Sequence, residues 1–167
     1  MKNAKRLTKE KEDNKTPDEF FYVQPVGTDM FKWHFTLRGM PGSAYEGGLY
    51  HGYFDIPNDY PFSPPNIFFM NESGRYQPNT KICLTITTYH KEEWSPAWTI
   101  RSMTQAVSSH FVVDDSGIGS ITKSAAERKK IAVSSRAYVC PSCGPLVNIE
   151  KLILDNFKKE APKPTLK

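Results

Sequence analysis

Apolar and polar residues alternate most clearly between Phe31 and Arg38, where every second side chain is apolar. This period of two predicts a half-buried strand, which Met40-Pro41-Gly42 ends. Three further segments have the composition of strands joined by short turns: 20–26, 49–56 and 66–70. The pattern therefore predicts a four-stranded antiparallel meander.

A short basic helix is predicted from Ala4 to about Glu12, before the strands. Leu7 is its one large apolar residue. Because so short a helix is marginal alone, it must dock on the rest of the domain.

Helices are predicted again after the strands. Thr99 can cap one whose apolar residues recur at helical spacing. Ser124 opens a capping box before a helix that runs to about Tyr138. Asn148 can cap the last helix. The order of elements predicts an α+β fold.

The region between the strands and these helices, residues 74–98, has no clear period and predicts a long ordered loop. Loops of this length are uncommon without a function. Cys83 lies here, eleven residues before Trp94-Ser95-Pro96-Ala97-Trp98. Since a lone cysteine is most often a small buried hydrophobe, its neighbours decide whether it is a reactive thiol.

Length and charge indicate one folded domain with charged ends. At 167 residues with 13% aromatics, the chain suits a single domain with a real core. The net charge of +4 comes from the ends, and the middle of the chain is slightly acidic. This distribution argues against nucleic-acid binding. We expect a basic helix and lead-in over 1–15, the core over 16–158 and a linker-like end over 159–167.

Three cysteines do not make a disulfide framework, so we expect a reducing, cytoplasmic compartment. Lys2 and the polar run after it argue against a secretory signal peptide. No apolar stretch approaches the ~20 residues needed to cross a bilayer.

Cys140 and Cys143 have the spacing of a zinc-binding pair. A structural zinc needs four ligands, however, and the sequence shows no second pair. His90 and His110 are distant in sequence. We therefore expect two reduced thiols in a turn and no bound metal.

Three blocks of the chain, in order, resemble the ubiquitin-conjugating enzymes. They are Pro41 to Tyr50, Tyr60-Pro61-Phe62-Ser63-Pro64-Pro65, and the active-site block, which runs from Pro78 to Leu84 around Cys83 and continues from Trp94 to Ile100. The resemblance covers roughly residues 5–140 and implies the ubiquitin-conjugating (UBC) fold, in which an N-terminal helix, the meander, a long active-site loop and further helices follow one another.

The tripeptide before the cysteine and two further segments narrow the resemblance to one subfamily. Most members carry His-Pro-Asn eight residues before the cysteine, whereas here Gln77-Pro78-Asn79 ends four residues before it. The segments from Asn71 to Tyr76 and from Cys140 to Gly144 resemble the J-type branch that works in endoplasmic-reticulum-associated degradation. The chain departs from that branch at Ser73, where asparagine is common, and at Lys91, where proline is common.

The resemblance implies a reaction through Cys83. Its thiolate would accept ubiquitin as a thioester and pass it to a substrate. Asn79, or less readily Asn71, would donate to the oxyanion or brace the loop, although Asn79 is equally typical of a turn. His90 is a candidate base, and Asp114 and Asp115 are candidates to orient the acceptor. Each of these three is otherwise a surface residue. The branch also modifies hydroxyl groups, which a histidine base would suit.

Partner surfaces follow from the same resemblance. Phe62 and the loop Ser95, Pro96 and Ala97 would meet a RING-type ligase, although Phe62 could instead close the edge of the core. The first helix would meet the activating enzyme through Lys5, Arg6 and Lys9. No cofactor is expected, since ATP is used by the activating enzyme.

Two alternatives remain open at this stage: an enzyme for another ubiquitin-like modifier, and a non-catalytic ubiquitin-binding variant of the fold. Cys83 argues against the second. The branch usually carries a C-terminal membrane anchor, so the protein is either soluble or tethered to the cytosolic face of the endoplasmic reticulum by a tail outside this chain.

Overall fold

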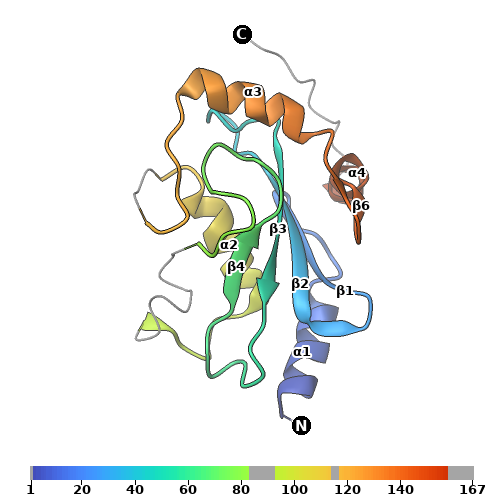
Figure 1. Ribbon diagram of the computed structural model, residues 1–167. Helices are drawn as coiled ribbons and strands as arrows, with labels where there is room; N and C mark the ends of the chain where they lie inside the picture. The colour runs from blue at the N-terminus through green and yellow to red at the C-terminus, as the bar shows by residue number, and fades with distance from the viewer. Residues whose placement is uncertain (1, 83–92, 114–116, 158–167) are drawn as a thin grey trace.

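The computed structural model describes residues 2–82, 93–113 and 117–157. A four-stranded sheet forms its centre, with helices before and after it (Figure 1). The elements are α1 (Lys2–Asp13), β1 (Phe21–Val26), β2 (Asp29–Arg38), β3 (Leu49–Asp55), β4 (Asn66–Phe69), α2 (Ile100–His110), α3 (Ala125–Ser135), β5 (Val139–Cys140), β6 (Gly144–Pro145) and α4 (Leu146–Phe157).

The sheet has the order β1-β2-β3-β4, with each neighbouring pair antiparallel. This confirms the predicted meander. In the β2–β3 register Phe35 lies opposite Gly52, and a Cβ atom on Gly52 would stand 2.2 Å from the Phe68 carbonyl oxygen on β4. Glycine at this position therefore lets the strands approach closely.

The main core lies between the sheet and the first two helices. Alternate β2 residues Trp33, Phe35 and Leu37 are buried in it. Leu7 of α1 is fully buried against this cluster, which confirms that the short helix docks on the domain. Residues at helical spacing on α2 complete the cluster: Ile100, Met103 and Val107.

The opposite face of β2 is covered at His34 and Thr36, so the prediction of a half-buried strand was wrong there, whereas Lys32 on the same face is exposed. His34 is 6% exposed and Thr36 is 1% exposed. Figure 1 shows β6 and α4 beside this part of the sheet, and α4 contacts β1, β2 and β3. The polar face that the alternation predicts for β2 is therefore covered by β6 and α4, which follow β2 by about a hundred residues in the sequence.

Two helix boundaries differ from the prediction for tertiary reasons. Helix α3 begins at the Ser124 capping box but ends at Ser135, three residues before Tyr138. At this end the Ser135 hydroxyl accepts a hydrogen bond from the Leu49 N–H, and Arg136 forms an ion pair with Glu150. These bonds tie the end of the helix to β3 and α4.

The last helix starts at Leu146, so Asn148 lies inside it and is not its cap. The segment before it forms the small β5–β6 hairpin, where the sequence predicts only a turn. The Leu146 N–H donates to the Tyr138 carbonyl at 3.1 Å and closes the hairpin. Across the described residues, no helix is both long and apolar enough to cross a membrane.

Candidate active-site surface

The segment that leads to Cys83 is held against the sheet. The Ile82 N–H donates to the Ile67 carbonyl at 3.1 Å, and Lys81 forms an isolated bridge with Phe68. Ile82 is 1% exposed and belongs to the main core. The chain is therefore fixed up to the residue that precedes the candidate nucleophile. Cys83 itself and the candidate base His90 lie outside the described residues.

A second segment, from Gly117 to Ile121, lies on this lead-in. The Gln77 N–H donates to the Gly119 carbonyl at 2.7 Å. Gly119 has φ +87°, and a Cβ atom there would stand 2.8 Å from the Lys81 carbonyl oxygen. Glycine is therefore required for the close approach of the two segments. Asp114 and Asp115, the candidates to orient the acceptor, lie outside the described residues.

A buried arginine joins these segments to α2. Arg75 is 1% exposed, and its guanidinium donates to the carbonyl of Phe111, the carbonyl of Val113 and the Ser120 hydroxyl. Its planar fork suits three acceptors in different directions. Arg75 lies in the segment from Asn71 to Tyr76 that resembles the J-type branch, but its role in bracing the loop is not visible in the sequence.

Ser73, where the chain departs from the resembled branch, serves the same loop. The Ser73 hydroxyl oxygen accepts from the N–H groups of Arg75 and Tyr76, both at 3.1 Å. A serine can close this turn in place of the common asparagine, since its oxygen reaches backbone donors two and three residues on. The departure therefore leaves the turn intact.

The two candidate asparagines have different environments. Asn79 is exposed and has φ +57°, a conformation in which asparagine is enriched. Asn71 is 6% exposed, accepts from the His51 N–H and donates to the Leu49 carbonyl. Both ends of its amide are used to extend the pairing of β3. Of the two, Asn79 is the exposed residue, and it lies four positions before Cys83 in the sequence.

The predicted ligase surface is exposed and braced. Phe62 is 68% exposed, which excludes the alternative that it closes the edge of the core. Ser95, Pro96 and Ala97 are also exposed. The Trp94 indole N–H donates to the Pro61 carbonyl at 2.8 Å and joins the two loops that carry these residues.

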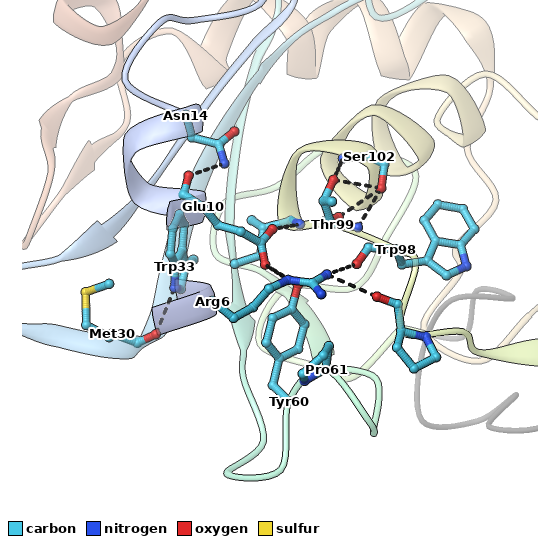
Figure 2. A network of polar contacts seen from close by, with 12 residues as sticks. Arg6, Glu10, Asn14, Met30, Trp33, Tyr60, Pro61, Trp98, Thr99 and Ser102 are labelled. Carbon is cyan, nitrogen blue, oxygen red and sulfur yellow. Dashed lines mark hydrogen bonds and ion pairs between the residues drawn. The ribbon is translucent and has the colours of Figure 1, made fainter. Parts of the chain in front are cut away.

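Helix α1 is fastened to the same loop by the network in Figure 2. Arg6 donates to the carbonyls of Pro96, at 3.1 Å, and Trp98, at 2.7 Å, and forms an ion pair with Glu10. Arg6 is therefore engaged within the fold, whereas Lys5 and Lys9 are exposed. Of the three residues predicted to contact an activating enzyme, Lys5 and Lys9 are therefore the two that are exposed to solvent.

Glu10 is the centre of that network, and sequence reasoning missed it. Its carboxylate is buried and accepts from Arg6, from the Tyr60 hydroxyl at 2.7 Å and from the Ile100 N–H at 2.6 Å. Burial, and then the Glu10 charge, raise the pKa of Tyr60 well above its usual range, so the hydroxyl stays a donor. The i, i+4 spacing of Arg6 and Glu10 was a readable signal for the ion pair.

The cysteine pair has two histidine neighbours that are distant from it in the sequence. His34 on β2 and His51 on β3 offer ring nitrogens that lie, with the sulfurs of Cys140 and Cys143, all within 4.8 Å of one another. The premise that no second ligand pair accompanies the cysteines is therefore wrong. Both histidines are on strands, far from the cysteines in sequence.

Burial determines the charge of this cluster. It lowers the pKa of His34 to about 4, helped by Lys32, and the pKa of His51 to about 3, so both imidazoles are neutral at pH 7. Burial and the neighbouring Cys140 raise the pKa of the Cys143 thiol to about 12. Neutral imidazole is the form of histidine that ligates metals.

Comparison with known proteins identifies the family. A family model described as "Ubiquitin-conjugating enzyme" matches residues 6–127. Human "Ubiquitin-conjugating enzyme E2 J1" is 39% identical over 142 residues, which are 84% of this chain and 45% of that protein. "Ubiquitin-conjugating enzyme E2 32" of Arabidopsis thaliana is 38% identical over 80% of this chain and 44% of its own length. This chain thus spans less than half the length of these relatives.

A solved structure agrees with the sequence relatives. The E2 domain of a Toxoplasma gondii ubiquitin conjugating enzyme superimposes with a TM-score of 0.55 and 33% identity, over 68% of this chain and 77% of that one. The observed helix, meander and later helices are thus those of the UBC fold, as the resemblance implied. The chain belongs to the ubiquitin-conjugating enzyme family and matches its J-type members.

Proposed function

We propose that this protein is an active ubiquitin-conjugating enzyme with Cys83 as its nucleophile. Its thiolate attacks the thioester that joins ubiquitin to the activating enzyme, and the activating enzyme's cysteine leaves as a thiolate. An acceptor nitrogen or oxygen on the substrate then attacks the new thioester, and the Cys83 thiolate leaves. Family membership and the fixed lead-in at Ile82 support this role.

The transfer step needs an oxyanion donor and a base. Asn79 is proposed as the donor, or as the brace of the loop, because its side chain is exposed and the Asn71 amide is already bonded to β3. His90 is proposed to take the proton of the acceptor, which for a hydroxyl group must be removed during attack. Asp114 and Asp115 are proposed to orient that acceptor.

The observation that carries the proposal is the surface formed by Phe62 and residues 95–97. An exposed aromatic ring between prolines makes a rigid anchor for a partner. The Trp94–Pro61 hydrogen bond and the Arg6 contacts with the loop hold the surface in place without a partner. Such preorganisation lowers the entropic cost of docking, so the surface is proposed to bind a RING-type ligase.

The pathway is proposed from the J-type relatives. The resembled branch works in endoplasmic-reticulum-associated degradation, so we propose that the enzyme acts at the cytosolic face of that membrane. The first helix, with Lys5 and Lys9 in solvent, is proposed to meet the activating enzyme.

A charging assay tests the function. The chain is mixed with activating enzyme, ATP and ubiquitin, and the products are separated on gels with and without reductant. We expect an adduct that reductant removes from the parent chain, and either no adduct or a reductant-stable ester on Cys83→Ser. No adduct with ubiquitin, in a chain shown to be folded, would contradict the proposal. The same gel with other modifiers then separates an enzyme for a different modifier from a binding module.

A further inference from the structure

Three elements far apart in sequence bring four metal-binding side chains together. His34 comes from β2, His51 from β3, and Cys140 and Cys143 from the β5–β6 hairpin. In the β2–β3 register His34 lies opposite Tyr53 and Thr36 opposite His51, so the two histidines are diagonal neighbours on one face of the sheet. The hairpin covers that face. The geometry points to a structural zinc site formed by these four residues.

The distances within the cluster suit one small cation. The His34 Nδ1 atom lies 3.0 Å from His51 Nε2, 3.6 Å from Cys140 Sγ and 3.5 Å from Cys143 Sγ. A tetrahedral zinc ion, with bonds of about 2.0–2.1 Å to nitrogen and about 2.3 Å to sulfur, separates its ligand atoms by roughly 3.3–3.8 Å. The three separations from His34 Nδ1 lie in or close to that range, and all four ligand atoms lie within 4.8 Å of one another.

A single hydrogen bond at His34 Nδ1 does not account for all three of its close contacts. A single imidazole nitrogen carries either one hydrogen or one lone pair. His34 Nδ1 can therefore serve only one of the three atoms that converge on it. A cation between the four atoms accepts one lone pair from each and satisfies all of them together.

The second shell has the arrangement that zinc-bound histidines need. His51 directs Nε2 into the cluster, and its Nδ1 lies 2.8 Å from the Thr36 hydroxyl. If Nε2 binds the metal, Nδ1 carries the hydrogen and donates it to Thr36. A bond of this kind fixes the tautomer and the ring orientation of a ligating histidine.

The hairpin has the shape of a two-cysteine zinc turn. Cys140 and Cys143 are separated by two residues, and Gly144 follows with φ +83°. Cys140 pairs with Gly144 across the hairpin. Glycine supplies the left-handed conformation that returns the chain after the second cysteine.

Charge balance favours a dication with these ligands. The histidines bind as neutral imidazoles, and each thiol loses its proton to solvent when its sulfur binds the metal. Two thiolates then neutralise one Zn²⁺, so the buried site carries no net charge. Two sulfurs and two nitrogens in tetrahedral array are the ligands typical of zinc.

All four positions are supplied by the protein, which is typical of structural and not catalytic zinc. A cavity of about 190 Å³, lined in part by Gln24, Thr36 and Cys143, lies beside the cluster and gives the metal a path from solvent. Bound there, zinc would join the hairpin, and the α4 helix that follows it, to β2 and β3. The inference does not depend on the proposed transferase function.

Metal content and cobalt spectroscopy test the site. The full chain is purified in reductant without metal-affinity resin, and its zinc is counted by elemental analysis. The zinc is then replaced by Co²⁺. We expect one zinc per chain, and a cobalt spectrum with tetrahedral visible bands and a thiolate-to-metal charge-transfer band. Zn²⁺ should displace Co²⁺, because Zn²⁺ has no d-electron preference for octahedral water that it must give up in a tetrahedral site.

Matched variants identify the ligands. Cys143→Ser changes the most exposed of the four and should lose stoichiometric zinc, with a charge-transfer band reduced to that of one thiolate. Cys83→Ser and His110→Gln remove a cysteine and a histidine outside the cluster and should keep one zinc. Thr36→Val should weaken binding by about 10–100-fold, the range for a lost second-shell bond. Chelator should lower the Tm of the parent and leave that of Cys143→Ser unchanged.

Cys143→His serves as a second variant in case Cys143→Ser does not fold. It replaces one sulfur ligand with a nitrogen ligand, so it should retain one metal ion with the spectrum of one thiolate and three imidazoles. A folded parent chain that binds no zinc, or that binds Co²⁺ without a charge-transfer band, would overturn the inference. So would equal zinc content in the parent and Cys143→Ser, or loss of zinc from Cys83→Ser. In those cases the cluster holds only thiol–imidazole hydrogen bonds.

Discussion

At the scale of single residues, neighbours in space separate side chains that look equivalent in the sequence. Asn71 and Asn79 are both asparagines close to Cys83, but one has its amide bonded to β3 and the other is exposed in a left-handed turn. Phe62 and Phe69 are both aromatic residues near prolines, yet Phe62 is 68% exposed and Phe69 is fully buried. Within each pair, we therefore expect substitution of the buried residue to lower stability and substitution of the exposed residue to affect function.

The roles of Asn71 and Asn79 can be distinguished by measuring both the free energy of unfolding and the rate of ubiquitin transfer in a variant of each. Asn71→Ala removes the partners of two buried backbone groups, so we expect a loss of about 1–3 kcal/mol in the free energy of unfolding. Asn79→Asp keeps the left-handed turn but removes the amide donor, and should slow ubiquitin transfer by about 10²–10³-fold with little change in stability. Urea unfolding and single-turnover discharge of the thioester measure the two effects.

Asn79→Gly is the control for the turn, because glycine adopts the same backbone conformation without a side chain. Transfer at the parent rate in Asn79→Gly would show that the backbone turn is sufficient. The oxyanion role of the Asn79 amide would then be wrong.

Phe62→Ala tests the ligase surface. Because the ring is mostly in solvent, we expect a change in unfolding free energy within about 0.5 kcal/mol. Charging by the activating enzyme should be unchanged, and ligase-stimulated discharge should fall at least tenfold if Phe62 is a hot spot. Leu152→Ala truncates another exposed side chain, on α4, and should leave both reactions unchanged. Equal discharge by Phe62→Ala and the parent would contradict the assignment.

At the scale of elements, buried polar groups determine how helices attach to the sheet. Glu10 ties α1 to Tyr60 and to the first N–H of α2. Glu150 of α4 ties Arg136, at the end of α3, to the rest of the domain through a bidentate ion pair. In each attachment a single carboxylate accepts all of these bonds. The stability of the fold should therefore be sensitive to the loss of either carboxylate.

Glu10→Ala tests the attachment of α1. It leaves the Tyr60 hydroxyl and the Ile100 N–H without their acceptor, and each buried donor that loses its partner costs about 1–3 kcal/mol. Glu12→Ala is the matched control on the same helix, because its ion pair with Lys15 is exposed. We expect the control to change stability by less than about 0.5 kcal/mol. Urea midpoints at unchanged m-values measure both, and equal midpoints for the two variants would refute the role given to Glu10.

At the scale of the whole molecule, positive charge is placed at separate ends. Figure 1 shows α1 extending beyond one end of the sheet and α3 lying at the other. Lys5 and Lys9 are exposed on α1, and Lys129 and Lys130 are exposed on α3. Two surfaces of similar charge thus face different directions, which allows a test of the surface used by the activating enzyme.

Charge reversal distinguishes the two ends. Lys5→Glu with Lys9→Glu should slow charging of Cys83, mainly through the association rate, and the effect should shrink as salt is raised. Lys129→Glu with Lys130→Glu makes the same change of net charge at α3 and should leave charging unchanged. Charging rates are measured across a series of salt concentrations. Equal slowing by both double variants would mean that only net charge matters.

Patterns within a few residues were sufficient for most of the elements. Alternation over Phe31–Leu37 predicted β2, and the capping residues Thr99 and Ser124 predicted the starts of α2 and α3, because strand periods and caps depend on near neighbours. The resemblance around Cys83 predicted the family for the same reason, since its blocks are contiguous segments. The exposed Phe62 could also be expected from the prolines around it.

Only the tertiary structure decided which residues that are far apart in the sequence come into contact. The sequence presented His34 as a polar residue on a half-exposed strand, and the structure buries it beside Cys140, 106 residues later. Likewise Glu10 meets Ile100 across 90 residues. No local pattern encodes such a distance, because it depends on the path of every element between the two residues. Strands, helices and family membership were therefore determined by the sequence itself, whereas the buried Glu10 network and the cluster of two histidines and two cysteines arise from packing of the whole fold.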